Sequence, residues 1–228
     1  MKIAVLGTGM VGRAVADRLS ALGHDVVMGT RDVEQTLART EPDRRGDVPV
    51  AQWQRTHPAV RLASFADAAA YGEVVVNATP GALSLSALEA AGAANLAGKV
   101  LLDIAMPLDR SQGMPPTLTV ANTGSLAEQI QRTYPAARVV KSLNTMLADT
   151  MVDPSRIPGR HNVFVAGEDA DAKETVRSLL RGFGWPDEAI IDLGGIRGAR
   201  GAEMYGALLF AVWAALGTFD FNIAIVRK

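Results

Sequence analysis

The sequence contains no cysteine and very little histidine. Among its 228 residues there is no Cys, and the three histidines are His24, His57 and His161, which lie far apart. The lack of cysteine excludes disulfide bonds, thiolate metal ligands and thiol redox chemistry. Three isolated histidines offer no recognisable spacing for a metal site. Any chemistry must therefore come from other residue types or from an organic cofactor.

A net charge of either sign is also missing. Lys and Arg number 23 and Asp and Glu number 24, which gives a formal net charge of −1. This balance gives no reason to expect binding to nucleic acid or to a membrane surface. The first apolar run is interpreted as the first strand of the fold and not as a signal peptide. We therefore expect a soluble cytoplasmic protein without nucleic-acid or membrane partners.

The most informative feature that is present lies at the start of the chain. The apolar residues 3–6 lead directly into a G-x-G-x-x-G motif formed by Gly7, Gly9 and Gly12. Residues 10–22 then show the helical spacing of apolar side chains, and a second apolar strand is expected at 25–28. This order of strand, glycine-rich turn, helix and strand predicts a dinucleotide-binding unit.

Each glycine has a physical task in such a unit. Gly7 permits the tight turn, Gly9 lets a pyrophosphate approach the backbone, and Gly12 lets the helix pack closely on the strand. The helix N-terminus adds unpaired N–H groups and a partial positive charge, both of which favour phosphate.

The end of the second expected strand indicates which dinucleotide binds. An NAD site has Asp or Glu there, whereas this chain has Thr30 followed by Arg31. A hydroxyl group and a guanidinium suit a 2′-phosphate, so the sequence predicts NADP(H). Asp32 is expected to cap the next helix. In the alternative interpretation Arg31 is solvated and Asp32 binds the ribose.

Strand and helix patterns alternate along most of the chain. They predict an α/β fold: a Rossmann-type, doubly wound, mostly parallel sheet with a small C-terminal α+β appendage. We expect an NADP-binding domain at 1–150 and a smaller substrate or dimerisation region at 151–228. Residues 40–58 are expected to form a surface excursion and residues 221–226 an edge strand. The helix expected at 202–216 is apolar nearly all round, so it must be buried in a core or a subunit interface.

Polar residues at expected strand ends are candidates for the chemistry, because ligands bind there in doubly wound sheets. Asn77 and Asn144 could bind a nicotinamide carboxamide or stabilise turns. Asp103 is expected to fix a loop. By residue type Lys141 is the best candidate general acid, but no carboxylate lies near it in the sequence, so no catalytic residue is assigned.

No further proton-transfer arrangement accompanies these residues. There is no convincing Ser/His/Asp set and no Tyr-x-x-x-Lys arrangement. Arg197 and Arg200, near the start of the apolar helix, either bind an anionic group or are surface charges. A nucleotide fold without an acid or base suits direct hydride transfer between two cofactors.

Four motifs together resemble the F420-dependent NADP reductase family. They are Gly-Thr-Gly-Met-Val-Gly at 7–12, Gly-Thr-Arg-Asp at 29–32, Ala-Thr-Pro at 78–80, and the more specific Lys-x-x-Asn-Thr at 141–145. The resemblance covers residues 1 to about 183, while 194–219 resemble bacterial members of unassigned substrate.

The resemblance implies hydride transfer between NADP(H) and a small-molecule redox partner, either the deazaflavin coenzyme F-420 (F420) or a flavin. It implies no catalytic acid or base, and a homodimer whose interface would account for the apolar helix. The pyrophosphate, 2′-phosphate and nicotinamide would contact a cofactor site consisting of Gly7, Thr8, Gly9, Met10, Val11, Gly12, Thr30, Arg31, Ala78, Thr79, Pro80, Asn144 and Thr145. Two alternatives stay open: an NADPH-dependent reductase of a small carbonyl or imine substrate, and a non-catalytic NADP(H)-binding sensor.

Overall fold

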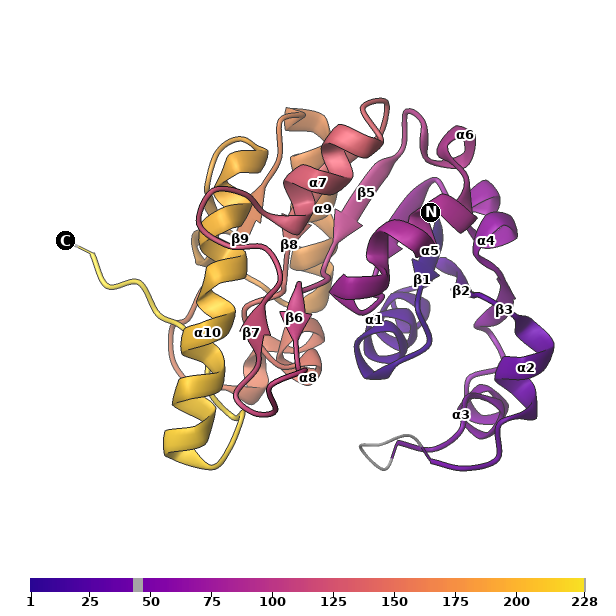
Figure 1. Ribbon diagram of the computed structural model, residues 1–228, viewed down its shortest axis with the longest axis horizontal. Helices are drawn as coiled ribbons and strands as arrows, with labels where there is room; N and C mark the ends of the chain where they lie inside the picture. The colour runs from indigo at the N-terminus through magenta and orange to yellow at the C-terminus, as the bar shows by residue number, and fades with distance from the viewer. Residues whose placement is uncertain (43–46, 228) are drawn as a thin grey trace.

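An eight-stranded sheet forms the centre of the chain (Figure 1). The computed structural model describes residues 1–42 and 47–227. The strand order is β10-β9-β8-β5-β4-β1-β2-β3, which reverses direction from β1 as in a doubly wound fold. The strand bounds are Lys2–Leu6 (β1), Asp25–Thr30 (β2), Arg61–Ser64 (β3), Val74–Asn77 (β4), Val100–Asp103 (β5), Arg138–Ser142 (β8), Val163–Ala166 (β9) and Ile190–Asp192 (β10).

Helices cover both faces of this sheet, so its central strands are apolar except at their carboxyl ends, where β4 ends in Asn77 and β5 in Asp103. Every residue of β4 and β5 is buried. One core lies under α1 and α9, and a second lies under α4, α5 and α7. The expected α/β doubly wound fold is confirmed. The helix bounds are Met10–Ala21 (α1), Val33–Ala38 (α2), Val50–Thr56 (α3), Phe65–Tyr71 (α4), Ser84–Ala91 (α5), Ala93–Leu96 (α6), Leu126–Thr133 (α7), Ala148–Val152 (α8), Ala170–Phe183 (α9) and Ala199–Leu216 (α10).

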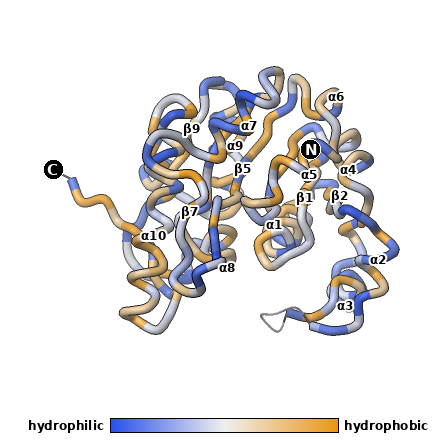
Figure 2. Tube along the Cα trace, in the orientation of Figure 1, coloured by the Kyte–Doolittle hydropathy of each residue, from blue (hydrophilic) through white to orange (hydrophobic). Residues whose placement is uncertain are grey.

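The C-terminal third extends the same sheet and then adds a long helix. Strand β9 pairs with β8 in antiparallel fashion, and β10 pairs with β9 in parallel. Apolar residues run along α10 and into the C-terminal tail (Figure 2). Within the described residues, no helix combines the length and apolarity that a membrane crossing requires. The division into domains at residue 150 stays a prediction.

The prediction of an edge strand at 221–226 is wrong. No strand is formed there, and the tail instead contacts Asn162. The Asn162 backbone N–H donates to the Ile223 carbonyl at 2.9 Å, and the Asn162 side-chain oxygen accepts from the Ile225 N–H at 2.7 Å. Val226 is 94% exposed. The Asn222 amide also lies 2.8 Å from the His161 ring, so the tail is held at His161 and Asn162 and not along a ladder.

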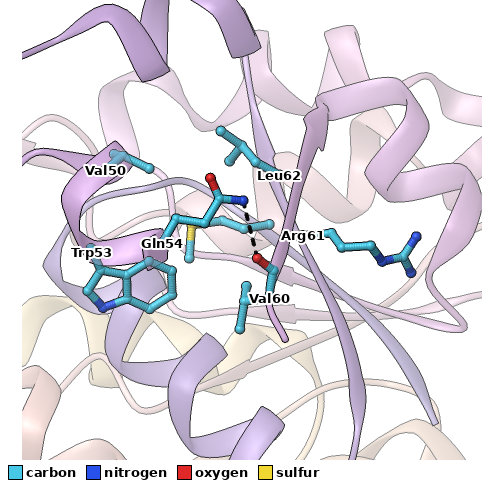
Figure 3. Close-up of a pocket in the computed structure, with 7 residues that line it drawn as sticks. Val50, Trp53, Gln54, Val60, Arg61 and Leu62 are labelled. Atoms are coloured by element: carbon cyan, nitrogen blue, oxygen red, sulfur yellow. Dashed lines mark hydrogen bonds between the residues drawn. The ribbon is translucent and has the colours of Figure 1, made fainter. Parts of the chain in front are cut away.

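The excursion expected at 40–58 contains a helix, α3, which packs on the edge of the sheet. Val50 and Trp53 of α3 face Val60 and Leu62 around a small pocket (Figure 3). The Gln54 side chain donates to the Val60 carbonyl at 3.4 Å. A short two-stranded ladder of β6 (Leu108–Asp109) and β7 (Thr117–Leu118) lies apart from the main sheet, beside α10.

Candidate functional site

A cleft of about 1720 Å³ lies along the carboxyl ends of the parallel strands. Residues that follow β1, β2, β4, β5 and β8 line it, which is where ligands bind in doubly wound sheets. Its volume exceeds the roughly 300–1,000 Å³ of an ordinary small-molecule pocket, so it has room for a dinucleotide and a second ligand. The expected site residues that line the cleft are Gly7, Thr8, Gly9, Met10, Val11, Thr30, Arg31, Ala78, Thr79, Pro80 and Asn144.

The glycine motif forms the turn from β1 into α1. Gly7 has a φ of +115°, and a Cβ on it would lie 2.7 Å from the Ala78 carbonyl oxygen. A Cβ on Gly12 would lie 2.1 Å from the Gly7 carbonyl oxygen, so this glycine permits the close contact of helix and strand instead of lining the cleft. Around Gly9 there is nothing within 4 Å of the added Cβ, which leaves the open space that a pyrophosphate needs.

At the end of β2, Thr30 and Arg31 differ in whether their side chains are already hydrogen-bonded. The Thr30 hydroxyl lies 2.7 Å from that of Thr36, which in turn donates to the Asp32 carbonyl at 2.6 Å. Thr30 therefore has its hydroxyl hydrogen directed to Thr36. Arg31 is exposed and forms no hydrogen bond or ion pair with the described residues. Asp32 caps α2, as expected, by accepting from the Gln35 N–H at 2.9 Å.

Two further arginines line this end of the cleft and were missed in the sequence. Arg13 of α1 donates to the Thr8 carbonyl at 2.9 Å and to the Val48 carbonyl at 2.5 Å, so it ties the glycine turn to the segment before α3. Arg39, at the end of α2, is exposed and lines the cleft. The sequence did contain a signal for Arg13: it directly follows Gly12 and so lies on the first turn of a predicted phosphate-binding helix.

A buried polar network joins β4 to β5 beneath the cleft. The Asn77 amide donates to Asp103 at 2.8 Å and to Ser84 at 3.0 Å, and its oxygen accepts from the Thr79 hydroxyl at 2.6 Å. Asp103 also accepts from the Ala105 N–H at 3.2 Å. Both Asn77 and Asp103 are completely buried. The role expected of Asp103, fixing a loop, agrees with these contacts, and Asn77 serves the same loops.

Lys141 lies next to this network and is fully buried. Its Nζ is 2.9 Å from Asp103 and 3.1 Å from Glu203, and it also donates to the Ala105 carbonyl. Burial by itself would lower the pKa of Lys141, but the two carboxylates outweigh burial and raise the pKa above its ordinary value. The amine thus stays protonated and does not line the cleft. Its carboxylate partners are 38 and 62 residues away, too far to be found by local inspection.

Glu203 connects Lys141 to two helices. It projects from α10, and its carboxylate accepts from the Leu126 and Ala127 N–H groups at 2.7 and 3.1 Å, at the N-terminus of α7. Arg200, one turn earlier in α10, donates two hydrogen bonds to Glu128 of α7, at 2.7 and 2.8 Å. Arg200 is therefore neither an anion ligand nor a free surface charge in this structure. These contacts fix α10 against the strand ends.

Asn144 combines a strained loop with an unused acceptor. The preceding Leu143 is buried at a φ of +66°, a conformation that costs a non-glycine residue energy. The Asn144 amide donates to the Ala202 carbonyl at 2.8 Å, whereas its Oδ1 is buried without a partner among the described residues. The Thr145 hydroxyl is also buried and unpartnered there, but Thr145 does not line the cleft. A buried acceptor of this kind is available to a donor from a bound ligand or a water molecule.

Known proteins place these features in a family. The family model described as NADP oxidoreductase, coenzyme F420-dependent, matches residues 2–107. The F420-dependent NADP reductase of Methanothermobacter marburgensis is 30% identical over 213 residues, which are 92% of this chain and 91% of that one. The chain belongs to the F420-dependent NADP reductase family. It is accordingly an NADP-dependent oxidoreductase, and NADP(H) is its nucleotide.

Two other proteins extend this comparison. A crystal structure of a candidate F420-dependent NADP reductase from Arthrobacter sp. FB24 is 58% identical, covers all of both chains and superposes with a TM-score of 0.93. The rat metalloreductase STEAP3 is 26% identical over 223 residues, which are 96% of this chain but 40% of that protein. The chain therefore spans less than half the length of STEAP3.

Proposed function

We propose that the protein transfers a hydride between NADP(H) and the deazaflavin coenzyme F420. Family membership supports this, together with a cleft that exceeds the volume of one small-molecule pocket. We call the cleft residues numbered 7–50 the nucleotide half and those numbered 104–219, apart from Asn144, the acceptor half. When both cofactors are bound, they would supply the chemistry, the transfer of a hydride from nicotinamide C4 to deazaflavin C5 with uptake of one proton from water at ring nitrogen N1, and the two halves of the cleft would hold them.

The observation that carries this proposal is the composition of the acceptor half. Among its described residues there is no Asp, Glu, His, Lys or Tyr, and Arg110 is the only one that carries a charge. The reduction of a carbonyl or imine requires a positioned proton donor, whereas hydride transfer between two organic cofactors requires alignment and the exclusion of competing reactions. Lys141 is buried behind this half in ion pairs, so we infer that it holds the strand ends in place.

The site residues are proposed to act in three groups. The open N-terminus of α1 with Thr8, Gly9, Met10 and Val11 holds the pyrophosphate. Arg31 holds the 2′-phosphate, since Thr30 already donates to Thr36, and Arg39 lines the same half of the cleft. The unpaired Oδ1 of Asn144 accepts a hydrogen bond from the nicotinamide carboxamide, while Ala78, Thr79 and Pro80 lie along the dinucleotide.

We also propose that the protein acts as a homodimer. Large apolar side chains of α10 are exposed, with Leu208 at 56% and Leu216 at 59%. A second copy of the chain would cover them, which agrees with the interface expected for this apolar helix. Light scattering should report twice the mass of one chain, and a Leu208→Glu variant should report one chain. The cytoplasmic location stays a prediction.

The test of the reaction uses purified protein, NADPH and oxidised F420. The deazaflavin absorbance should bleach rapidly with NADPH and remain with NADH. If NADPH binds and no bleaching follows, the F420 assignment is wrong, and the two remaining candidates are a carbonyl or imine reductase and an NADP(H)-binding sensor. Those two are then separated by whether any acceptor oxidises the bound NADPH.

A further inference from the structure

Arg110 is a charged group without a partner in an otherwise uncharged half of the cleft. It is exposed and forms no hydrogen bond or ion pair through its side chain with the described residues. The nucleotide half has arginines of its own, Arg13, Arg31 and Arg39, and Arg31 is the one proposed to hold the 2′-phosphate. A guanidinium is always charged and offers five donors in a planar fork that matches phosphate and carboxylate groups. Arg110 is therefore available to an anion that the NADP(H) site does not account for.

The loop that carries Arg110 is held in place by its own hydrogen bonds. Asp109 accepts from the Ser111 N–H at 2.8 Å, which lowers the pKa of that carboxyl, and so Asp109 is turned toward its own loop. The Gly113 N–H donates to the Arg110 carbonyl at 3.0 Å and closes the turn. At the base of the hairpin, the Thr119 N–H donates to the Pro107 carbonyl at 2.8 Å. The nearest carboxylate in sequence is thus engaged, and within residues 1–42 and 47–227 the Arg110 side chain has no counter-ion.

The wall contributed by α10 and by Phe219, which follows it, is apolar and aromatic. Phe210 and Phe219 line the acceptor half, with their rings 5.9 Å apart and perpendicular, and Phe219 stacks on Trp213 at 5.2 Å. The Lys141–Glu203 ion pair holds the same helix against the strand ends. A rigid apolar wall suits a planar ring system, and a cation at the rim suits a charged group attached to that ring.

We propose that Arg110 binds the anionic tail of the acceptor, while the ring lies against the apolar wall of α10. This inference rests on the proposed function, because it takes the acceptor to be a deazaflavin. In F420 the ring carries a ribityl chain that continues into a phosphodiester, a lactate and glutamates. The anion at Arg110 is either the phosphodiester or a carboxylate of this tail. Arg110 accordingly separates tailed from tail-less acceptors and has no part in nucleotide choice.

The test measures binding apart from turnover. The protein is saturated with NADP⁺, so that no hydride is available, and oxidised deazaflavins are titrated by fluorescence. Three ligands are compared: the deazaflavin with a bare ribityl chain, the form that carries the phospholactate alone, and the full coenzyme with its glutamates. The variants are Arg110→Gln and, as a matched control, Arg160→Gln, which changes an exposed arginine that does not line the cleft.

Wild-type protein should bind the full coenzyme about 10- to 100-fold more tightly than the bare deazaflavin, the range expected for hydrogen bonds between charged groups. Arg110→Gln should bind all three alike, with unchanged affinity for NADPH, and Arg160→Gln should match wild type. The phospholactate form assigns the anion: binding as tight as that of the full coenzyme indicates the phosphodiester or lactate, and weaker binding indicates the glutamates.

Two results would overturn the inference: an Arg110→Gln variant that keeps the preference for the tail, or a wild-type protein that has none. Failure of the proposed function is recognised separately. If wild-type protein reduces the bare deazaflavin with NADPH but shows no preference for the tail, the reaction stands and the role of Arg110 is wrong. If the preference depends on Arg110 and no deazaflavin is reduced, the tail site stands and the reaction is wrong.

Discussion

The two halves of the cleft are built in different ways. In the nucleotide half the glycine turn, the strand end at Thr30 and the arginine that follows lie within 25 residues of one another. The acceptor half is assembled from the β6–β7 hairpin, the loop after β8 and helix α10, which are separated by long stretches of chain. The first half depends on local backbone geometry, whereas the second depends on buried ion pairs that join distant segments. Changes in the two halves should therefore have different consequences.

The largest expected effect comes from removing the cation that joins those segments. Lys141→Met leaves Asp103 and Glu203 buried without it, and breaking a buried ion pair in this way costs about 3–5 kcal/mol of folding stability. Unfolding in urea measures the loss. Lys99→Met is the matched control: the Lys99 amine donates to the Ala69 and Ala70 carbonyls, so its removal leaves no carboxylate uncompensated and should cost less.

The same Lys141→Met variant also tests catalysis. If it is as stable as wild type, the acceptor half does not depend on this ion pair and the comparison between the two halves fails. If it folds, binds NADPH normally and no longer turns over, Lys141 acts as the proton donor considered from the sequence. Positioning predicts instead that stability and the KM for the acceptor change together.

Local patterns in the sequence predicted the glycine turn and the Asp32 cap of the nucleotide half but missed Arg13 and Arg39, and they did not predict how the acceptor half is assembled. The three glycines, the Asp32 cap and the free Arg31 all follow from residues within one βαβ unit. No carboxylate lies near Lys141 in the sequence, because its partners Asp103 and Glu203 are distant along the chain. The signal was nevertheless present: Asp103 and Lys141 both lie at strand ends, and β5 and β8 pair these two residues directly. A prediction that β5 and β8 are neighbouring strands would have identified Asp103 as a partner of Lys141.

Other features of the acceptor half had no local signature. Arg110 lies in a proline- and glycine-rich loop, where a single arginine is unremarkable in sequence, and only the surrounding cleft makes it informative. The strain at Leu143 follows from the packing of the loop after β8 and not from the residue type. The apolar tail at 221–226 fits a strand pattern, yet its contacts with Asn162 replace sheet pairing.

The second largest effect should be confined to the nucleotide half. Arg31→Ala removes charge-assisted hydrogen bonds to the 2′-phosphate, which are worth about 1.5–3 kcal/mol, or 10- to 100-fold in the Kd for NADPH. Binding of NADH should change little. Fluorescence titration of both nucleotides measures the difference. Equal weakening of NADPH and NADH would count against the 2′-phosphate assignment, and no change in either would favour the alternative in which Arg31 is solvated and Asp32 binds the ribose.

Gly12 and Gly9 of the same turn have different roles, since Gly12 permits close packing and Gly9 permits access of the ligand. An alanine at Gly12 would bring its Cβ within 2.1 Å of the Gly7 carbonyl oxygen, so Gly12→Ala should cost about 1–2 kcal/mol of stability after the gain in helix propensity. Gly9→Ala meets nothing within 4 Å and should leave stability unchanged, but it should weaken NADPH binding at least about tenfold. If Gly9→Ala binds NADPH as wild type does, the pyrophosphate does not approach the backbone there.

The smallest expected effect is a pH dependence in the support of the acceptor half. The two hydrogen bonds from Arg200, helped by Ser125 and opposed by burial, lower the pKa of Glu128 below its usual 4.5. A carboxyl whose pKa is lowered by folding adds stability above its unfolded pKa, and this stability is lost as the pH falls through the folded pKa. The stability of wild type should therefore exceed that of Glu128→Gln by about 1 kcal/mol near pH 7, and the difference should close below pH 4.5.

Unfolding curves at several pH values measure this difference, with Glu34→Gln, which removes an exposed carboxylate, as the control. A difference that does not change with pH would mean that Glu128 joins α7 to α10 by its shape and not by its charge, and the acceptor half would then depend on the Lys141 cluster alone.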